Sequence, residues 1–451
     1  IIIFALPFFN DFVQKQLAFP FDLVSVSGLF LLTVFVGLLA GVYPSLVLSS
    51  FNPVVVMKGK FTSSEKGKWI RNGLVVFQFW ISIVLMIGTL VIGQQMKYMR
   101  EKSLGFDKEQ VLVVERMFNM EGLQAKTFLE ELNLLPQVIH AAGSFAMPGE
   151  QGDFFGIQFQ PEGSSEILTT KSMVIADEFG ETLGLELLEG KWFSKETNDS
   201  LSIMLNETAV KVMGLENPIG RKLVNMQQRG EENVAIPYVV TGIVKDFNFV
   251  SLRDHVTPLV IQSNEAFGRN VGVGYGIVRI KPGEVPAAIQ AVETKWKQVM
   301  PAQQFKFSFL DQNLTQLYSN EEQMGKLFTV FSVLAIFVAC IGLFALSAYI
   351  TSLRTKEIGV RKVLGASVTG VVVLLSKDIS RMVLIAFILA VPVAWYLMEN
   401  WWLQNFAYRI QISAWIILVA GAIAFMIAWL TVSYQSIKAA TQNPVKSLRY
   451  E

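Results

Sequence analysis

The chain has 451 residues, of which 52% are hydrophobic and only 17% are charged. Soluble domains average about a quarter charged residues, so this composition and a mean hydropathy of +0.43 favour a membrane protein. The net charge of +1 gives no reason to expect a nucleic acid partner, and a single cysteine, Cys340, excludes an internal disulfide framework.

Apolar runs at the start of the chain predict membrane helices. Residues 21–48 are long enough to cross a bilayer, which takes about 20 residues. The chain opens at Ile1 inside another apolar run, without the basic start and cleavage site of a signal peptide. We therefore expect residues 1–48 to hold the last two transmembrane helices of a first half of a longer protein, the first of them partial.

The next segments differ sharply in character. Residues 49–71 carry five lysine or arginine residues against one glutamate, which predicts a cytoplasmic linker. Residues 72–96 are predicted to form a transmembrane helix that projects from the bilayer as a stalk. Residues 97–323 mix strand-type and helix-type patterns, which predicts an α+β domain. Within it we expect strands at 111–115, 238–244 and 276–280 and helices at 122–135 and 286–300.

The C-terminal part alternates spans with short loops. The excess of lysine and arginine at 49–71, 353–367 and 437–451 predicts that these segments are cytoplasmic and that residues 97–323 lie outside. A recurring alanine, at Ala420, Ala424 and Ala428, predicts a helix-packing stripe. We expect transmembrane helices at 324–350, 379–398 and 414–436, a cytoplasmic segment at 351–378, a short periplasmic loop at 399–413 and a cytoplasmic tail at 437–451.

Two segments of the chain are similar to each other. Residues 43–54 and 434–445 share a tyrosine, a serine and an Asn-Pro-Val triplet at one constant offset, and both follow a predicted span. We therefore expect residues 1–60 to be the end of a first half whose earlier part is absent from this sequence.

The loop at 353–367 has the pattern of a short amphipathic helix lying on a bilayer surface. Gly365 is placed to end this helix, and Ser367 is placed to cap the next one. Because Ile358 falls on the basic side, away from lipid, we expect a pocket of a partner protein to bury it. The apolar side holds Leu353, Val360, Val363 and Leu364. The basic side holds Arg354, Arg361 and Lys362.

The alternative is an ordinary basic loop of a membrane protein. However, the sequence Arg-Thr-Lys-Glu-Ile-Gly-Val-Arg-Lys-Val-Leu-Gly-Ala at 354–366 resembles the signature loop of the MacB/FtsX family of ABC transporter permeases. The resemblance implies an α-helical membrane protein with a large periplasmic α+β domain of the MacB-like periplasmic core type, here in a two-half, eight-helix variant. Further similar segments are residues 72–82, 205–214, 218–221, 242–247 and 443–449.

For function, the resemblance implies a permease subunit that works by mechanotransmission. It would couple ATP hydrolysis by a separate ATPase subunit to movement of the periplasmic domain, for efflux or extraction of a peptide, lipoprotein or drug. A complex of the same architecture that senses a ligand or activates a cell-wall hydrolase is the alternative. The residues that the resemblance assigns to contact with the ATPase are Arg354, Lys356, Glu357, Ile358, Arg361, Lys362, Leu364 and Gly365.

The resemblance also implies partners and a location. The ATPase subunit would bind ATP and magnesium, so no cofactor is expected in this chain. Membrane lipid is a second partner, and a periplasmic adaptor or a second permease copy is a third. The expected location is the bacterial inner membrane, which the chain crosses several times, with the large domain in the periplasm.

Motifs of catalysis are missing from the sequence. It has no Gly-x-x-x-x-Gly-Lys-Ser/Thr phosphate loop, so we do not expect this chain to hydrolyse ATP itself. His140 and His255 have no cysteine or histidine at ligand spacing, so no metal site is expected. Asn206 opens an Asn-Glu-Thr glycosylation sequon, a pattern that is frequent by chance.

Overall fold

The computed structural model describes two compact units. One unit is helical and holds Ile1–Ile92, Gln323–Met398 and Ile412–Glu451. The other contains the β-sheet and holds Gly93–Glu322 and Glu399–Gln411. The described residues are 2–13, 16–49, 65–149, 154–163, 165–194, 199–229, 232–267 and 273–441.

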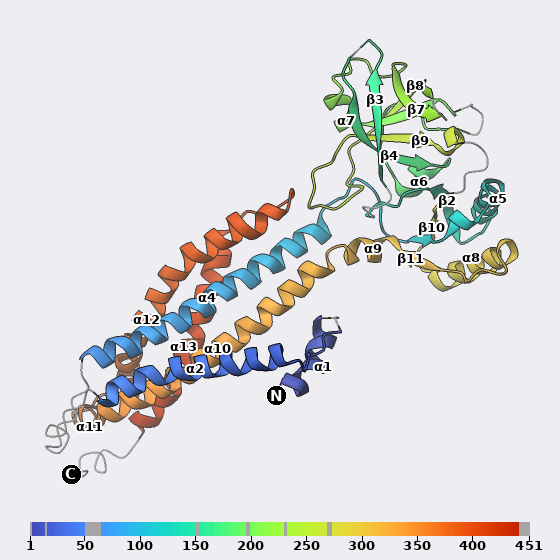
Figure 1. Cartoon of the computed structure of the whole chain (residues 1–451). Helices are drawn as coiled ribbons and strands as arrows, with labels where there is room; N and C mark the ends of the chain where they lie inside the picture. Colours follow the sequence, from blue (N-terminus) through green and yellow to red (C-terminus); the bar gives the residue numbers. More distant parts are fainter. Residues whose placement is uncertain are drawn as a thin grey trace. The chain divides into compact units, whose positions relative to one another are not determined.

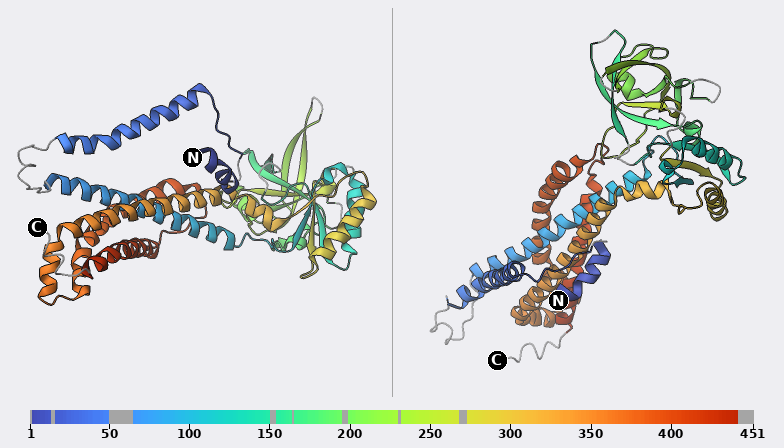
Figure 2. Two further views of the ribbon diagram at one scale, coloured as in Figure 1. Left: turned by 90° about the horizontal axis from the view of Figure 1, so that it is seen from below. Right: turned by 45° about the vertical axis from the view of Figure 1, so that its right-hand side comes forward.

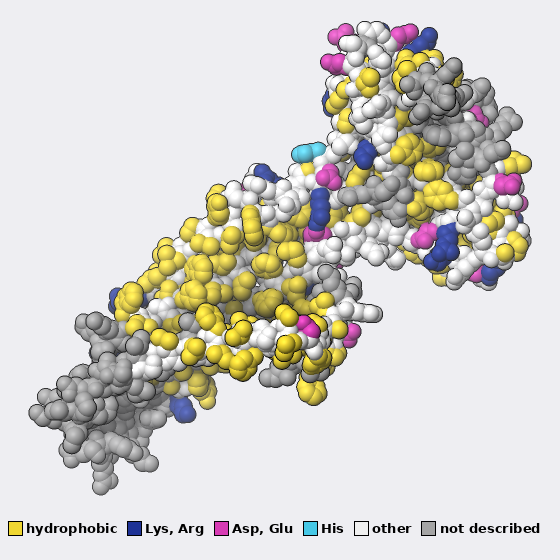
Figure 3. Space-filling view, viewed as in Figure 1, with side chains coloured by type: hydrophobic (Ala, Val, Ile, Leu, Met, Phe, Trp, Pro, Cys, Tyr) yellow, Lys and Arg dark blue, Asp and Glu magenta, His cyan; other side chains and the backbone are white. Residues whose placement is uncertain are grey.

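The helical unit consists of long apolar helices (Figure 1). In the described part of the chain, five helices are long and apolar enough to cross a bilayer. Figure 3 shows hydrophobic side chains gathered over this unit, as expected for a surface that faces lipid. The five are α2 (Leu23–Ser49), α4 (Glu65–Glu101), α10 (Ser319–Leu353), α12 (Val368–Leu397) and α13 (Ala414–Ala440). The shorter helices are α1 (Ile2–Val13) and α11 (Thr355–Val363).

Small residues allow α12 and α13 to pack closely. The predicted stripe of Ala420, Ala424 and Ala428 on α13 is buried, which confirms it. A Cβ atom added to Gly421 would lie 2.5 Å from the ring of Phe387, so this position also requires a minimal side chain. The sequence analysis did not single out a matching buried set on α12, which consists of Ala386, Ala390 and Ala394.

Six of the described strands in the second unit close into a small barrel. The pairing runs β4–β3–β7–β8–β6–β9 and returns from β9 to β4. The β6–β8 and β4–β9 pairs are parallel, and the other pairs of the ring are antiparallel. Phe159, Leu205 and Tyr238 are among the side chains that fill its core. The strands are β3 (Phe155–Pro161), β4 (Leu168–Ile175), β6 (Ser202–Asn206), β7 (Lys222–Arg229), β8 (Glu232–Val244) and β9 (Leu259–Ser263), and β5 (Leu187–Gly190) pairs with β8.

A layer of four described antiparallel strands is built from the first two and the last two strands of the same domain in chain order. Its order is β11–β1–β10–β2, and β2 continues into the barrel by pairing with β4. Phe128 of α5 and Trp296 of α8 pack into its core. Because two strands precede the barrel and two follow it, the barrel is an insertion in this layer (Figure 2). The elements are β1 (Val111–Val114), α5 (Gly122–Asn133), β2 (Val138–Ser144), β10 (Tyr275–Ile280), α8 (Val285–Val299) and β11 (Phe307–Phe309).

Short elements complete the domain. They are η1 (Met117–Asn119), α6 (Phe179–Leu183), α7 (Glu207–Val212), η2 (Asn264–Phe267), α9 (Leu310–Gln316), η3 (Met398–Trp402) and η4 (Leu403–Asn405).

The fold class predicted from the sequence is confirmed, since long apolar helices accompany an α+β domain. The strands predicted at 111–115 and 276–280 are β1 and β10, and the predicted helices are α5 and α8. The predicted strand at 238–244 is the second half of the longer β8. The Asn-Pro-Val triplets at 52–54 and 443–445 lie outside the described residues, so the internal repeat stays a prediction.

Candidate coupling site

The loop predicted at 353–367 contains the helix α11, which begins at Thr355 because Leu353 still belongs to α10. The helix end predicted at Gly365 and the cap predicted at Ser367 are confirmed. Gly365 follows α11 with φ +89°, a left-handed conformation that glycine adopts without strain. The backbone N of Ala366 donates to the carbonyl of Arg361 at 2.9 Å, which closes the last turn. The side chain of Ser367 accepts a hydrogen bond from the backbone N of Gly370 at 3.1 Å and caps α12.

Ile358 is buried by this chain itself, contrary to the sequence-based expectation. Only 5% of its surface is exposed, and it clusters with Val371 and Leu375 of α12 and with Ile350 of α10. A helical wheel treats α11 in isolation and cannot show that another helix covers its basic side. The prediction that a partner's pocket buries Ile358 is therefore wrong. The side chain instead fixes α11 to α10 and α12.

The charged residues around Ile358 pair within the chain. Arg354 Nη2 lies 3.2 Å from Asp378 Oδ2 of α12. Arg361 Nη2 lies 2.8 Å from Glu357 Oε1, one helical turn away. These side chains are more than a third exposed, so each pair stabilises the fold by at most about 1 kcal/mol and chiefly orients α11. The side chains of Lys356 and Lys362 lie outside the described residues.

Asp378 is a residue of this site that sequence reasoning missed. Its approach to Arg354 depends on how α12 packs against α11, which no local pattern reports. The available signal was the charged group of Lys377, Asp378 and Arg381 in the first half of an apolar helix, where an unpaired charge is costly.

The outward side of α11 is apolar and exposed. Leu364 has 80% of its surface exposed, and its neighbours on this side are also about half exposed or more. These are the residues that the helical wheel placed on one side: Leu353 at the end of α10, Val360 and Val363 of α11, and Leu364 directly after it. A short helix that is fixed by Ile358 on one side and is apolar and exposed on the other can contact lipid or another protein.

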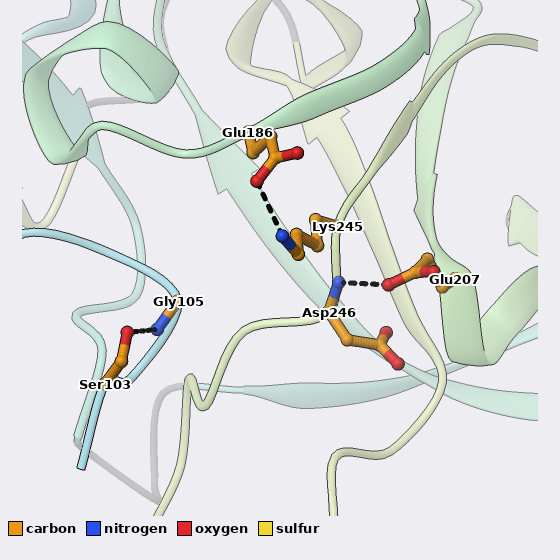
Figure 4. A network of polar contacts seen from close by, with 6 residues as sticks. All are labelled: Ser103, Gly105, Glu186, Glu207, Lys245 and Asp246. Atoms are coloured by element: carbon orange, nitrogen blue, oxygen red, sulfur yellow. Dashed lines mark hydrogen bonds and ion pairs between the residues drawn. The ribbon is translucent and has the colours of Figure 1, made fainter.

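Two domain segments that resemble the family meet in the structure (Figure 4). Asp246 N donates to Glu207 Oε2 at 3.1 Å, and the Asp246 carboxylate accepts hydrogen bonds from Thr208 N and Oγ1 at 3.0 and 2.6 Å. Lys245 Nζ lies 2.7 Å from Glu186 Oε2, and this hydrogen bond raises the pKa of Lys245. The contacts of Asp246 fasten α7 to the end of β8, and the contact of Lys245 ties the same end to the residue before β5.

Asn206, at the end of β6, connects the start of α7 to the start of β9. Its Oδ1 accepts hydrogen bonds from the backbone N of Ala209 and of Leu259, both at 2.9 Å. Its Nδ2 donates to the carbonyl of Thr257 at 3.1 Å. Because the side chain is fully buried, the Asn-Glu-Thr sequence acts as a helix cap and does not present an acceptor for a glycan.

Surface cavities also lie in the described part of the domain, two of which are lined as follows. One, of about 430 Å³, is lined by residues 175–181 and 192–194, and the other, of about 340 Å³, by Lys171 and residues 248–251 and 254–257. Among the described residues, no group of three histidine, cysteine or acidic side chains is arranged to hold a metal ion. Trp192 and Phe193 line the first cavity and Phe249 lines the second. Phe193, Phe247 and Phe249 are nevertheless buried.

Comparison with known proteins identifies the class of membrane protein to which this arrangement belongs. Residues 329–444, which contain α11, α12, α13 and most of α10, match the family described as FtsX-like permease C-terminal. Over 407 residues the chain is 20% identical to the macrolide export ATP-binding/permease protein MacB of Bdellovibrio bacteriovorus. That alignment covers 85% of this chain, which spans 60% of the length of that relative.

These matches confirm the resemblance inferred from the loop at 353–367. The chain is a membrane permease with an FtsX-like C-terminal domain. Its C-terminal part is thus similar to FtsX-like permeases, and most of the chain is similar to a MacB protein.

Solved structures similar to the domain are also known. The periplasmic region of MacB from Actinobacillus actinomycetemcomitans is 14% identical, with a TM-score of 0.36, and the match covers 48% of this chain and 94% of that one. The extracellular domain of the noncanonic ABC-type transporter YknZ from Gram-positive bacteria is 12% identical, with a TM-score of 0.31, and the match covers 44% of this chain and 98% of that one.

Proposed function

We propose that this chain is the permease subunit of an ABC transporter and couples ATP hydrolysis by a separate ATPase subunit to movement of its α+β domain. The observation that carries this proposal is the FtsX-like match over residues 329–444, because it includes α11 and both helices that hold it. A helix fixed at Ile358 to α10 and α12 passes a push on its outer side to those two spans.

In this mechanism the residues of the loop at 353–367 divide into two groups. Ile358 and Arg354 hold the helix from within, against α10 and α12. The ATPase subunit contacts the outward side at Leu364 and Gly365, together with Glu357 and Arg361, which are about half exposed. Lys356 and Lys362 add positive charge to the same contact by their place in the motif.

The proposed location is the bacterial inner membrane, with α11 in the cytoplasm and the α+β domain in the periplasm. Lipid surrounds the spans, and a periplasmic adaptor or a second permease copy completes the assembly. The cargo is a peptide, a lipoprotein or a drug. This choice is supported by the chain's similarity to a protein named for macrolide export, of which the chain spans 60%.

Impermeant thiol labelling in cells without an outer barrier tests the orientation. Leu134 of the domain and Leu364 are both strongly exposed, so a cysteine at either position is accessible from its own side of the membrane. On a Cys340→Ala background, we expect Leu134→Cys to be labelled in intact cells and Leu364→Cys to be labelled only after lysis. Labelling of Leu364→Cys from outside would overturn the orientation.

Purification of the full-length, tagged protein from its own membranes tests the coupling. We expect an ATPase subunit to co-purify, and ATP hydrolysis by the complex in lipid vesicles to accompany movement of a cargo. A complex that hydrolyses ATP but moves none of the three cargo classes would favour the regulatory alternative. Purification without any ATPase subunit would contradict the proposal.

A further inference from the structure

The loop between α12 and α13 contains a segment that depends on other parts of the chain for its hydrogen bonds. Residues 406–410, which we call the strap, follow η4 and have no regular secondary structure. The side chains of Leu403 and Phe406 are buried and anchor the start of the strap. Backbone N–H and C=O groups outside helices and strands still require hydrogen-bond partners. The partners of the strap backbone therefore show which parts of the chain hold the strap in place.

Gln95, near the end of α4, supplies two of these partners. Its Nε2 donates to the carbonyl of Tyr408 at 2.9 Å, and its Oε1 accepts from the backbone N of Ile410 at 2.9 Å. One amide therefore bridges two alternate residues of the strap, as a neighbouring strand would. Gln95 is fully buried, whereas the adjacent Gln94 is exposed. A buried amide is costly unless both of its ends are bonded, and here they are.

The other side of the strap bonds to the connection between β8 and β9. The backbone N of Ala407 donates to the carbonyl of Arg253 at 2.7 Å, and the N of Tyr408 lies 3.5 Å from the carbonyl of Leu252. The ammonium group of Lys102, just beyond α4, lies 4.4 Å from the centre of the Tyr408 ring, in a cation–π contact. The strap is thus held between α4 and this connection.

The same connection is tied to the start of α10. The backbone N of Leu252 donates to the hydroxyl of Tyr318 at 2.8 Å, and Arg253 forms an ion pair with the buried Glu321. Arg100 of α4 pairs with Glu322 in the same turn of α10. The end of α4, the start of α10 and the strap therefore form one bonded cluster, which we call the joint.

We infer that Gln95 is a positioning residue that makes the strap move with α4 and α10, so that a displacement of α12 and α13 reaches residues 248–257 of the domain. The inference rests on the proposed function and goes beyond it, because it names where the motion of the last two spans enters the domain. Residues 248–251 and 254–257 line the cavity of about 340 Å³, so movement of the strap changes the shape of that cavity.

Hydrogen exchange of the full-length protein in lipid nanodiscs tests the joint. Gln95→Met keeps the length of the side chain but removes both hydrogen bonds, and Gln94→Met makes the same change at the exposed neighbour. We expect backbone exchange in residues 403–411 to be about tenfold faster in Gln95→Met, since each lost bond releases a protected amide or its partner. Gln94→Met should exchange like the wild type. Unchanged exchange in Gln95→Met would overturn the inference.

A second variant removes the fastening on the opposite side. Ala407→Pro eliminates the N–H that donates to Arg253 and leaves every side chain of the joint in place. Phe406 already has φ −121° and ψ 125°, a conformation that a residue before proline favours. Ala407→Ser keeps the N–H and is the control. We expect Ala407→Pro, but not Ala407→Ser, to accelerate exchange in residues 403–411. Equal exchange in the two variants would contradict the joint.

The complex with its ATPase subunit tests the transmission. In the wild type we expect ATP to change the exchange of residues 248–257. In Gln95→Met we expect this change to be lost while ATP hydrolysis persists, which a merely structural role would not produce. If Gln95→Met loses both complex assembly and ATP hydrolysis, the positioning role is overturned. If ATP does not change the exchange of residues 248–257 in the wild type, the proposed function and the transmission of motion to the domain are both overturned. The exchange of wild type and Gln95→Met without ATP would still decide whether Gln95 holds the strap.

Discussion

Replacing Ile358 with aspartate is expected to reduce ATP hydrolysis by the complex at least about tenfold while the chain still inserts into the membrane. The wild-type side chain is buried between α10 and α12, where a carboxylate without a partner costs several kcal/mol. The helix α11 therefore detaches from α12, and a push on its outer side no longer reaches the spans. The measurement is the ATPase activity of equal amounts of purified complex in lipid vesicles.

The matched control is Ile358→Leu, which keeps an apolar side chain of the same volume and is expected to retain most of the activity. Protease accessibility of α11 should rise in Ile358→Asp and not in Ile358→Leu, which links the loss to detachment. If Ile358→Asp assembles and hydrolyses ATP like the wild type, α11 is not the coupling element.

Replacing Trp296 with alanine is expected to destabilise the α+β domain by about 3–5 kcal/mol, enough to unfold a marginally stable domain. Trp296 is fully buried, its ring centre lies 5.8 Å from that of Phe128, and its Nε1 donates to the carbonyl of Gln303 at 3.1 Å. The change removes the largest buried side chain between α5 and α8. The measurement is urea unfolding of residues 104–318 expressed alone, followed by circular dichroism.

Leu134→Ala serves as the control for this experiment, because Leu134 follows α5 but has 83% of its surface exposed. Its substitution should change the free energy of unfolding by less than about 0.5 kcal/mol. A wild-type fragment with an all-helical spectrum would refute the α+β fold of the isolated segment. An unfolding midpoint of Trp296→Ala equal to that of the wild type would show that the layer of α5 and α8 does not depend on this side chain.

The sequence by itself determined the features that depend on local periodicity and on special residues. Apolar runs of sufficient length predicted the spans, because a bilayer of fixed thickness requires them. Gly365 and Ser367 defined the helix ends around α11, since left-handed backbone and side-chain capping are properties of single residues. The stripe at Ala420 and Ala424 was readable for the same reason, as four-residue spacing is a property of one helix.

Only the tertiary structure decided which side of each element meets which neighbour. Ile358 was placed correctly on the basic side of α11, yet the conclusion that it needs a partner protein was wrong, because α12 returns to cover that side. The pairing of Arg354 with Asp378 and the insertion of the barrel between β2 and β10 join residues far apart in the chain. Gln95 gave no signal in the sequence, since its partners lie more than 300 residues away. Such contacts are set by the packing of whole elements, which a window of a few turns does not contain.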